Sequence, residues 1–274
     1  MTHTPASRLR VGCWSFTATQ SLADNDAEIR RGIVAAAAAG VQILLTPECC
    51  LPGYPGAVRP NFHDLSSCEL AEREDALLHC ADHYGITLVL GTAGSSGLAT
   101  SGLATSGLAN SSQSSWTNDA ATRTARYRKR CLTPSDETYF VAGNQPTIIT
   151  VDGWRCGLAV CYDLRFADVW ADLHRQAVDV LLVLAHMAGP DPDPGTKSAV
   201  IPSFCAVRAA EAATPLVFCN TAASDRWLDS GMWDARGLQT SAQGAGLLVC
   251  ELTPRATLAP WYTALRTTYL ARLA

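Results

Sequence analysis

The sequence predicts an α/β protein with a mixed β-sheet. Short apolar runs alternate along the chain with longer segments of helical periodicity. Some runs are separated only by a turn, which indicates hairpins, and others by a helix, which indicates crossovers between parallel strands. The chain has 274 residues, 48% of them hydrophobic, which is enough for one large core. No Pro/Ser-rich linker or charge block divides it, so we expect a single domain over residues 1–274.

The first part of the chain is predicted to alternate between strand and helix. Two amphipathic segments end just before Gly40 and Gly85, as helices often do. The run Val41–Leu45 is almost wholly apolar, which is typical of a strand buried on both faces. In order, we expect a strand over Leu9–Trp14, a helix over Ala27–Ala39 with its N-cap at Asp24 or Asn25, a strand over Val41–Leu45, a helix over Glu69–Tyr84 and a strand over Ile86–Leu90.

An internal repeat follows, with the units SGLAT, SGLAT and SGLAN over residues 96–110. Units this short and this rich in serine and glycine cannot build a core, so we expect a surface loop inserted at about 94–112. A lid over a site is the alternative interpretation. No glycine pattern of a nucleotide-binding loop opens a helix here, which argues against a phosphate site.

The second part of the chain is predicted to combine hairpins with further strand–helix units. The turn pair Asp152–Gly153 lies between two apolar runs and indicates a hairpin. Pro202 must lie in the first turn of its helix or kink it. The expected elements are two short strands within Trp116–Tyr127, strands over Thr147–Val151 and Trp154–Val160, a helix over Asp168–Ala177, a strand over Val180–Leu184, a helix over Lys197–Ala213, a strand over Leu216–Cys219, a strand and turn over Ser230–Gly237, a strand over Gly246–Leu252 and a helix over Trp261–Leu273.

Composition excludes several classes of function. The net charge of -4 and pI near 5.8 leave no basic surface for nucleic acid or anionic membrane. No apolar run approaches the roughly 20 residues that span a bilayer, and the amino terminus lacks a signal-peptide core. We therefore expect a cytoplasmic protein whose 11 cysteines are reduced thiols. His79 and His83 would share a helix face, but no further ligand cluster accompanies them, so we expect no metal.

Three residues from distant segments are candidates for chemistry. Glu48 follows a buried strand and precedes a Pro/Gly-rich loop, where a carboxylate is costly unless it is paired or used. Lys129 lies between an aromatic and an apolar residue at alternate spacing, so its side chain can point inward. Cys161 lies between an apolar strand and a helix, at the carboxyl end of the strand, where active sites of α/β proteins tend to lie.

A cysteine becomes a nucleophile only when a neighbour accepts its proton or stabilises its charge. His174 and His186 are available, but neither belongs to a recognisable Cys-His signature, and no G-x-S-x-G motif is present. A glutamate beside a lysine in a desolvated pocket is another solution. The glutamate acts as base, and the ammonium stabilises the developing negative charge.

Three segments resemble the signatures of the nitrilase, or carbon–nitrogen hydrolase, superfamily. They are LLTPE at residues 44–48 leading to Gly53–Tyr54, YRKRCL at residues 127–132 and GLAVCYDLRF at residues 157–166, with supporting similarity at residues 208–211 and 219–220. The resemblance extends from Leu9 to about Leu252. It implies a four-layer αββα sandwich with two mixed sheets, a homodimer or larger homo-oligomer, and no metal or organic cofactor.

The resemblance also implies roles for individual residues. Glu48 would be the general base, Cys161 the nucleophile, and Lys129 with the backbone N–H of Tyr162 the oxyanion donors. Glu137 matches the second glutamate of the family, which orients the lysine and the substrate. The residues expected near the substrate are Tyr54, Tyr162, His186 and Met187.

The residues after the cysteine favour one branch of the superfamily. Tyr162–Phe166 is similar to amidases, including omega-amidases, whereas nitrilases tend to carry Trp-Glu there. We therefore expect a hydrolase that cleaves a small amide through a Cys161 thioester and releases ammonia and a carboxylic acid. Hydrolysis of nitriles or of N-carbamoyl amides is the alternative within the superfamily. A non-catalytic interaction module of the same fold is the alternative outside enzymes.

Overall fold

The computed structural model describes residues 5, 7–96, 115–190 and 195–274, and within these ranges the strands form two six-stranded sheets. The first has the order β12-β1-β2-β3-β4-β5 and the second the order β11-β10-β9-β8-β7-β6. The strands of the first sheet are β1 (Leu9–Ser15), β2 (Ile43–Leu45), β3 (Thr87–Ser96), β4 (Ser115–Ala121), β5 (Arg126–Arg128) and β12 (Gly246–Leu252). The strands of the second sheet are β6 (Ile148–Val151), β7 (Trp154–Val160), β8 (Val180–Leu184), β9 (Leu216–Cys219), β10 (Ser230–Trp233) and β11 (Gln239–Gln243).

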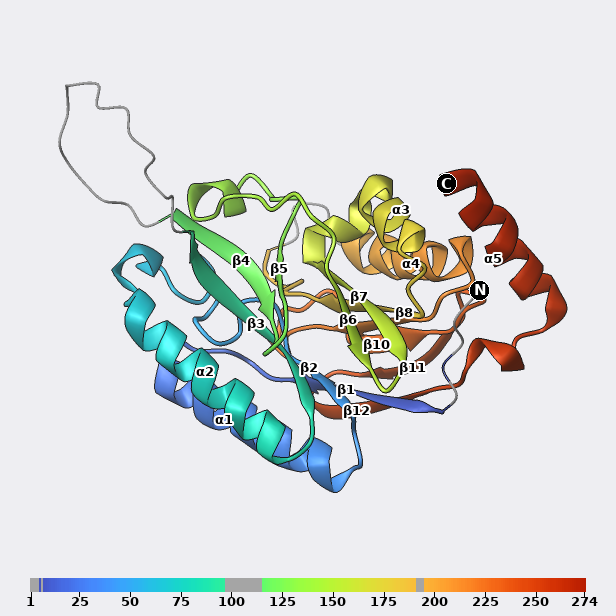
Figure 1. Ribbon diagram of the computed structural model, residues 1–274. Coiled ribbons are helices and arrows are strands. Elements are labelled where there is room, and N and C mark those ends of the chain that lie inside the picture. The colour runs from blue at the N-terminus through green and yellow to red at the C-terminus, as the bar shows by residue number, and fades with distance from the viewer. Residues whose placement is uncertain (1–4, 6, 97–114, 191–194) are drawn as a thin grey trace, which may run out of the picture.

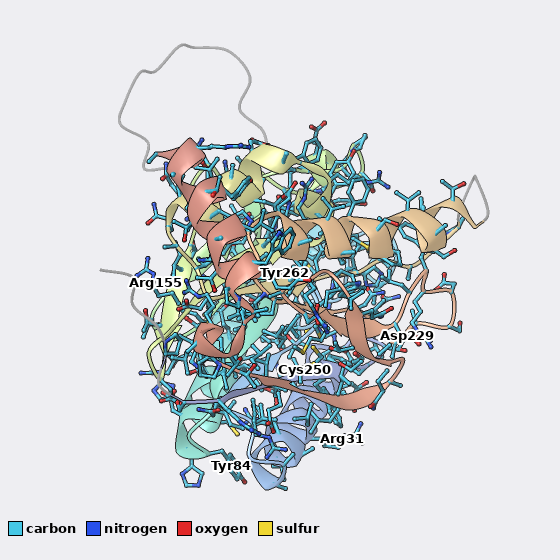
Figure 2. All side chains as sticks on the ribbon, turned by 90° about the vertical axis from the view of Figure 1, so that its right-hand side faces the viewer. Arg31, Tyr84, Arg155, Asp229, Cys250 and Tyr262 are labelled. Carbon is cyan, nitrogen blue, oxygen red and sulfur yellow. The ribbon has the colours of Figure 1, made fainter. Side chains whose placement is uncertain are left out.

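Helices cover the outer face of each sheet (Figure 1). Helices α1 (Leu22–Ala38) and α2 (Ser67–His83) pack on the first sheet, and α3 (Ala167–Arg175) and α4 (Thr196–Glu211) on the second. The carboxyl-terminal helix α5 (Pro260–Leu273) packs beside α3, and Figure 2 looks onto this helix, on which Tyr262 lies. This arrangement confirms the predicted αββα sandwich. None of the helices in the described ranges is both long and apolar enough to cross a bilayer.

Two apolar layers hold the sandwich together. The larger lies between the sheets, where Val11 and Ile43 of the first sheet belong to one buried cluster with Leu158 and Val183 of the second. The smaller lies between the first sheet and its helices. Each side chain of β8 is fully buried, as a strand covered on both faces should be. Burial of this apolar surface is the main favourable contribution to folding.

The strand directions place the functional segments at one edge of each sheet. Strands β1, β2 and β3 are parallel, as are β7, β8 and β9. Strands that run parallel have their carboxyl ends at the same end of the sheet. The chain leaves β7 toward Cys161 and β8 toward His186 in the second sheet, and it leaves β2 toward Glu48 in the first. The Glu48 N–H donates to the Ala185 carbonyl at 3.2 Å, which joins the segments of the two sheets.

The structure corrects several predicted boundaries. Helix α1 begins at Leu22, five residues before the predicted start, because the Ser21 hydroxyl caps it by accepting from the Asp24 N–H. Pro202 lies in the second turn of α4 rather than its first. Strand β11 escaped prediction because its side chains are mostly polar and lie at the sheet edge. Residues 97–112 of the predicted repeat loop lie outside the described residues.

Helix α3 buries His174 completely, with its ring edge-to-face against Tyr269 of α5. Burial, with further contributions from the charges of Arg266 and Arg208, lowers the pKa of His174 to about 3. The folded protein therefore holds this imidazole neutral, whereas the unfolded chain protonates it near pH 6.5.

The titration of His174 predicts a specific loss of stability in mild acid. As the pH falls from about 6.5 toward 3, the free energy of unfolding should drop by about 1.4 kcal/mol per pH unit, because only the unfolded chain binds the proton. The His174→Gln variant lacks this term. Urea unfolding at about pH 7 and about pH 5 should show the stability gap between wild type and variant shrinking; an unchanged gap would contradict the prediction.

Candidate active site

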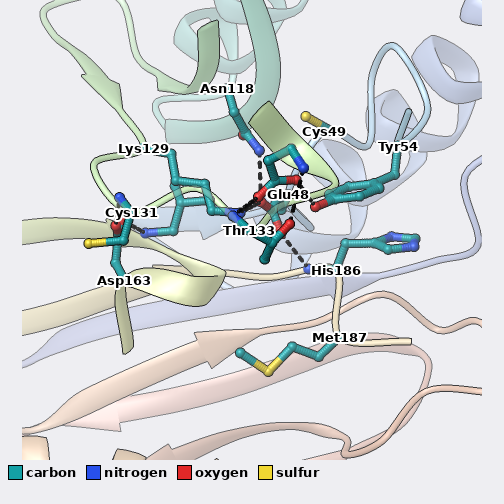
Figure 3. Close-up of polar contacts among 12 residues, drawn as sticks. Glu48, Cys49, Tyr54, Asn118, Lys129, Cys131, Thr133, Asp163, His186 and Met187 are labelled. Carbon is teal, nitrogen blue, oxygen red and sulfur yellow. Dashed lines mark hydrogen bonds and ion pairs between the residues drawn. The ribbon is translucent and has the colours of Figure 1, made fainter. Parts of the chain in front are cut away.

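Glu48 lies in the turn after β2 with its side chain fully buried. Its Oε1 accepts from the Lys129 ammonium and the Asn118 amide, each at 2.7 Å, and its Oε2 accepts from the His186 N–H at 2.9 Å (Figure 3). The turn passes very close to β3, since a Cβ atom on Gly91 would lie 1.8 Å from the Pro47 carbonyl oxygen. Three donors from three segments therefore hold one buried carboxylate in a single orientation.

Lys129 follows β5, and its side chain is also fully buried. The ammonium pairs with two carboxylates, Glu48 and Asp136, at 2.7 Å each. Burial alone would lower the pKa of Lys129, but the charges of these partners outweigh it and raise the pKa well above its ordinary value. The lysine is therefore a charged ammonium at neutral pH.

The carboxylate that contacts Lys129 from the following loop is Asp136, which corrects the prediction for Glu137. Glu137 is exposed to solvent, whereas Asp136 is buried. Asp136 points inward because it forms a reciprocal capping pair with Thr133: its Oδ2 accepts from the Thr133 N–H, and its N–H donates to the Thr133 hydroxyl. The Thr-x-x-Asp pattern is the sequence signal that could have identified it.

Cys161 is the residue after β7 and begins the 3₁₀ helix η3 (Cys161–Arg165). Its φ of 48° lies in the left-handed region, which a residue with a side chain rarely adopts and which is over-represented at functional sites. Burial raises the pKa of the thiol well above its ordinary value, the charge of Glu48 raises it further, and the charge of Lys129 lowers it. The thiol is therefore protonated at rest and lies within the electrostatic reach of both partners.

Of the four residues predicted to lie near the substrate, Tyr54 and His186 contact this charged group. The ring of Tyr54 stacks on His186 with centroids 4.5 Å apart, and its hydroxyl donates to Asp136 (Figure 3). Met187 is buried next to His186. Tyr162 is half-buried, with its ring edge-to-face against Phe166. Tyr54 and His186 thus bind the charged cluster through Asp136 and Glu48, whereas Tyr162 directly follows Cys161 in η3.

Asn118 of β4 is a site residue that the sequence did not reveal. Its amide donates to Glu48, and its backbone carbonyl accepts from the Lys129 N–H at 2.8 Å. It therefore contacts both members of the buried ion pair. Strand β4 contains several polar residues, and nothing in their order distinguishes the one that faces the site.

No group of three or more His, Cys, Asp or Glu side chains in the described ranges is arranged to hold a metal ion. The imidazole of His79 lies against the Arg123 guanidinium at 2.9 Å, a cation beside which a second cation would be repelled.

The sandwich and its cluster define a hydrolase of the nitrilase superfamily, as the resemblance predicted. The chain belongs to the carbon–nitrogen hydrolase family, whose pattern it matches over residues 14–250. Two hydrolases of Mycobacterium tuberculosis share 42% identity over 43 residues, a match that spans 16% of this chain and only 15% of each relative.

Solved structures show the same fold. An amidase from Nesterenkonia sp. superposes with a TM-score of 0.72 at 23% identity, covering 89% of this chain and 90% of that chain. A double mutant of the amidase from Nesterenkonia sp. AN1 in complex with acrylamide gives 0.74 at 23% identity over 98% of both chains. A mutant with the acetamide moiety of fluoroacetamide added covalently at its active-site cysteine gives 0.73 at 22% identity, also over 98% of both.

The position of Asp136 predicts unequal effects for two neighbouring substitutions. Burial alone would raise the pKa of Asp136, but Lys129 and the Tyr54 hydroxyl hold it below its ordinary value. Asp136→Asn should lower the free energy of unfolding by about 2 kcal/mol, the contribution of a hydrogen bond to a charged group. Because the pKa is depressed, this contribution is present at neutral pH and is lost as the pH falls through the folded-state pKa.

Glu137→Gln is the matched control and should leave stability unchanged at every pH, since its side chain is exposed. Urea unfolding of both variants and wild type at neutral pH measures the difference. Equal effects of the two substitutions would restore Glu137 as the partner of the lysine.

Proposed function

We propose that this protein is an amidase that hydrolyses the C–N bond of a small amide through a thioester on Cys161. The observation that carries the proposal is the fully buried Glu48–Lys129 ion pair, whose two charges both act on the Cys161 thiol. A buried ion pair is expensive to maintain. Such a pair suits a site in which a base and a fixed positive charge must both lie close to the amide carbon of the substrate.

The first half-reaction forms the thioester. Because the Cys161 thiol is protonated at rest, Glu48 takes its proton as sulfur attacks the amide carbon, and the carbonyl π electrons move onto oxygen. Lys129 and the backbone N–H of Tyr162 donate to this oxyanion. When the C–N bond breaks, Glu48 returns the proton to nitrogen, and ammonia leaves.

The second half-reaction regenerates the enzyme. Glu48 takes a proton from water as the water oxygen attacks the thioester carbon. The tetrahedral intermediate collapses with cleavage of the C–S bond, and the proton returns to sulfur. The product is a carboxylic acid, and the sum of the two halves is amide plus water giving acid plus ammonia.

The ammonium of Lys129 is suited to stabilise the oxyanion. It has three N–H donors, and its contacts with described residues engage two of them, at Glu48 and Asp136. The third is free for a substrate oxygen. An oxyanion donor of this kind contributes about 3 kcal/mol in comparable sites.

The solved neighbours support an amide substrate and a cysteine nucleophile. The Nesterenkonia sp. AN1 amidase has been seen with acrylamide and with an acetamide moiety attached to its active-site cysteine. Both molecules are small amides or derive from one. We therefore infer a small amide substrate for this chain as well.

Mass spectrometry of intact protein after incubation with amides, nitriles and N-carbamoyl acids tests the nucleophile and the substrate class together. We expect an acyl adduct on Cys161 and ammonia release with amides, and neither with Cys161→Ala. Cys68→Ser, which replaces an exposed thiol on α2, is the matched control and should keep full activity. Turnover of nitriles alone, or carbon dioxide release from N-carbamoyl acids alone, would reassign the substrate; full activity of Cys161→Ala would falsify the mechanism.

The hydrogen bond from Asn118 to Glu48 predicts a role in catalysis. Asn118→Ala should lower kcat by about tenfold, because losing one hydrogen bond to a charged group costs about 1.4 kcal/mol. Asn118→Asp should be worse, since it sets a second carboxylate against Glu48. Thr117→Val, which removes a hydroxyl bonded to the Gly94 carbonyl next to Asn118 on the same strand, should leave kcat unchanged. Steady-state kinetics with the amide that wild type turns over fastest measures these differences. An unchanged kcat in Asn118→Ala would show that this residue has no role in catalysis.

A further inference from the structure

Asp163 lies two residues after Cys161 in η3, and its carboxylate is fully buried. It accepts four hydrogen bonds. Its Oδ2 accepts from the Val160 N–H at 2.9 Å and from the Tyr127 hydroxyl at 2.8 Å. Its Oδ1 accepts from the Cys131 N–H at 2.8 Å and from the Arg130 N–H at 3.2 Å. All four partners are donors, so the arrangement suits the charged carboxylate.

The four donors belong to the two segments that carry the reactive side chains. Tyr127 precedes Lys129 by two residues, and Arg130 and Cys131 follow it directly, while Val160 directly precedes Cys161. One carboxylate therefore binds the chain on both sides of the lysine and immediately before the cysteine. Figure 3 shows Asp163 against Cys131, below the lysine side chain.

These two segments come from different sheets. Strand β5 is the edge of the first sheet and β7 belongs to the second, so no backbone ladder joins them. Between the sheets the contact is mostly apolar packing, which is non-directional and does not by itself fix a distance. Hydrogen bonds to one carboxylate have defined lengths and angles, and they supply that distance.

Asp163 also holds the strained turn around the cysteine. Its bond to the Val160 N–H spans Cys161, as the acidic residue of a capping box spans the start of a helix. Its backbone carbonyl accepts from the Trp170 indole N–H and from the Phe166 N–H, each at 3.1 Å. A residue with the positive φ of Cys161 persists only where its surroundings determine it in this way.

We propose that Asp163 is a positioning residue that sets the distance between the Lys129 ammonium and the Cys161 thiol. It binds both backbones and does not touch the substrate. This inference rests on the proposed function, in which lysine and cysteine act on the same carbonyl group.

The central test compares Asp163→Asn with Asp179→Asn. Asp179 is the matched control because it is also a buried carboxylate that accepts a backbone N–H of β7, from Arg155 at 2.9 Å, but at the opposite end of the strand. Three measurements are made on each variant: kcat and KM with the best amide, the pH dependence of Cys161 alkylation by iodoacetamide, and the thermal midpoint. A merely structural role moves the thermal midpoint alone.

We expect Asp163→Asn to lower kcat by about 10²-fold, the cost of a misplacement of about 1 Å, with a smaller change in KM. The alkylation profile should move to higher pH, because a displaced ammonium no longer lowers the pKa of the thiol against the charge of Glu48. Asp163→Ala should lower kcat further than Asp163→Asn, since an asparagine side-chain oxygen still accepts some of these hydrogen bonds. Asp179→Asn should keep kcat and the alkylation profile even where its thermal midpoint falls.

Tyr127→Phe keeps the proposal testable if Asp163→Asn does not fold. It removes one of the four donors and leaves the carboxylate with its three backbone partners. We expect a smaller fall in kcat and a smaller shift of the alkylation profile to higher pH. Wild-type kcat and an unmoved alkylation profile in Tyr127→Phe, when Asp163→Asn cannot be studied, would overturn the proposal.

The outcomes separate this inference from the proposed function. If wild type hydrolyses no amide and forms no adduct, the proposed function fails, and the alkylation profiles still decide the role of Asp163. If wild type is an amidase but Asp163→Asn keeps wild-type kcat and alkylation, the inference alone fails. Equal losses in Asp163→Asn and Asp179→Asn would also overturn it, because they would show a general effect of destabilisation.

Discussion

The buried ion pair between Glu48 and Lys129 is the interaction on which the site depends. Moving either charge out of water costs several kcal/mol, and their mutual attraction offsets this only when the remaining donors and acceptors are also satisfied. The structure meets that condition with Asp136 on the lysine and with Asn118 and the His186 N–H on the glutamate. Each additional partner comes from a different segment, so the ion pair constrains the loops around it.

The fold positions the residues of this site in two different ways. The parallel strands β7 and β8 bring Cys161 and His186 to the same end of the second sheet, and the His186 N–H joins them to Glu48, which follows β2 of the first sheet. Lys129 arrives differently, from the short edge strand β5, and needs its own fixation. The carboxylates of Asp136 and Asp163 provide it, one at the ammonium and the other at the backbone. Fixed charges in a desolvated site need little reorganisation during a reaction, which is the advantage of such an arrangement for catalysis.

The strands and helices were mostly predictable because hydrophobic periodicity reports burial directly. The hairpin at Asp152–Gly153 formed as predicted, with positive φ at both turn residues. Helix starts were less predictable, since the cap that begins α1 is a single hydroxyl before a stretch with little periodicity. The polar edge strand β11 carried no apolar signal at all.

The sequence by itself determined the α/β class and the family, and it singled out Glu48, Lys129 and Cys161 as candidates, because a charged residue or cysteine at the end of an apolar strand is visible in the order of residues. Only the tertiary structure decided which side chains complete the cluster. It chose Asp136 over Glu137, brought Asn118 to the glutamate and placed Asp163 between the two sheets. These contacts join residues up to 70 positions apart, as Asn118 and Glu48 are, and a hydrogen bond over that separation depends on the packing of sheets. Such packing leaves no local pattern in the chain.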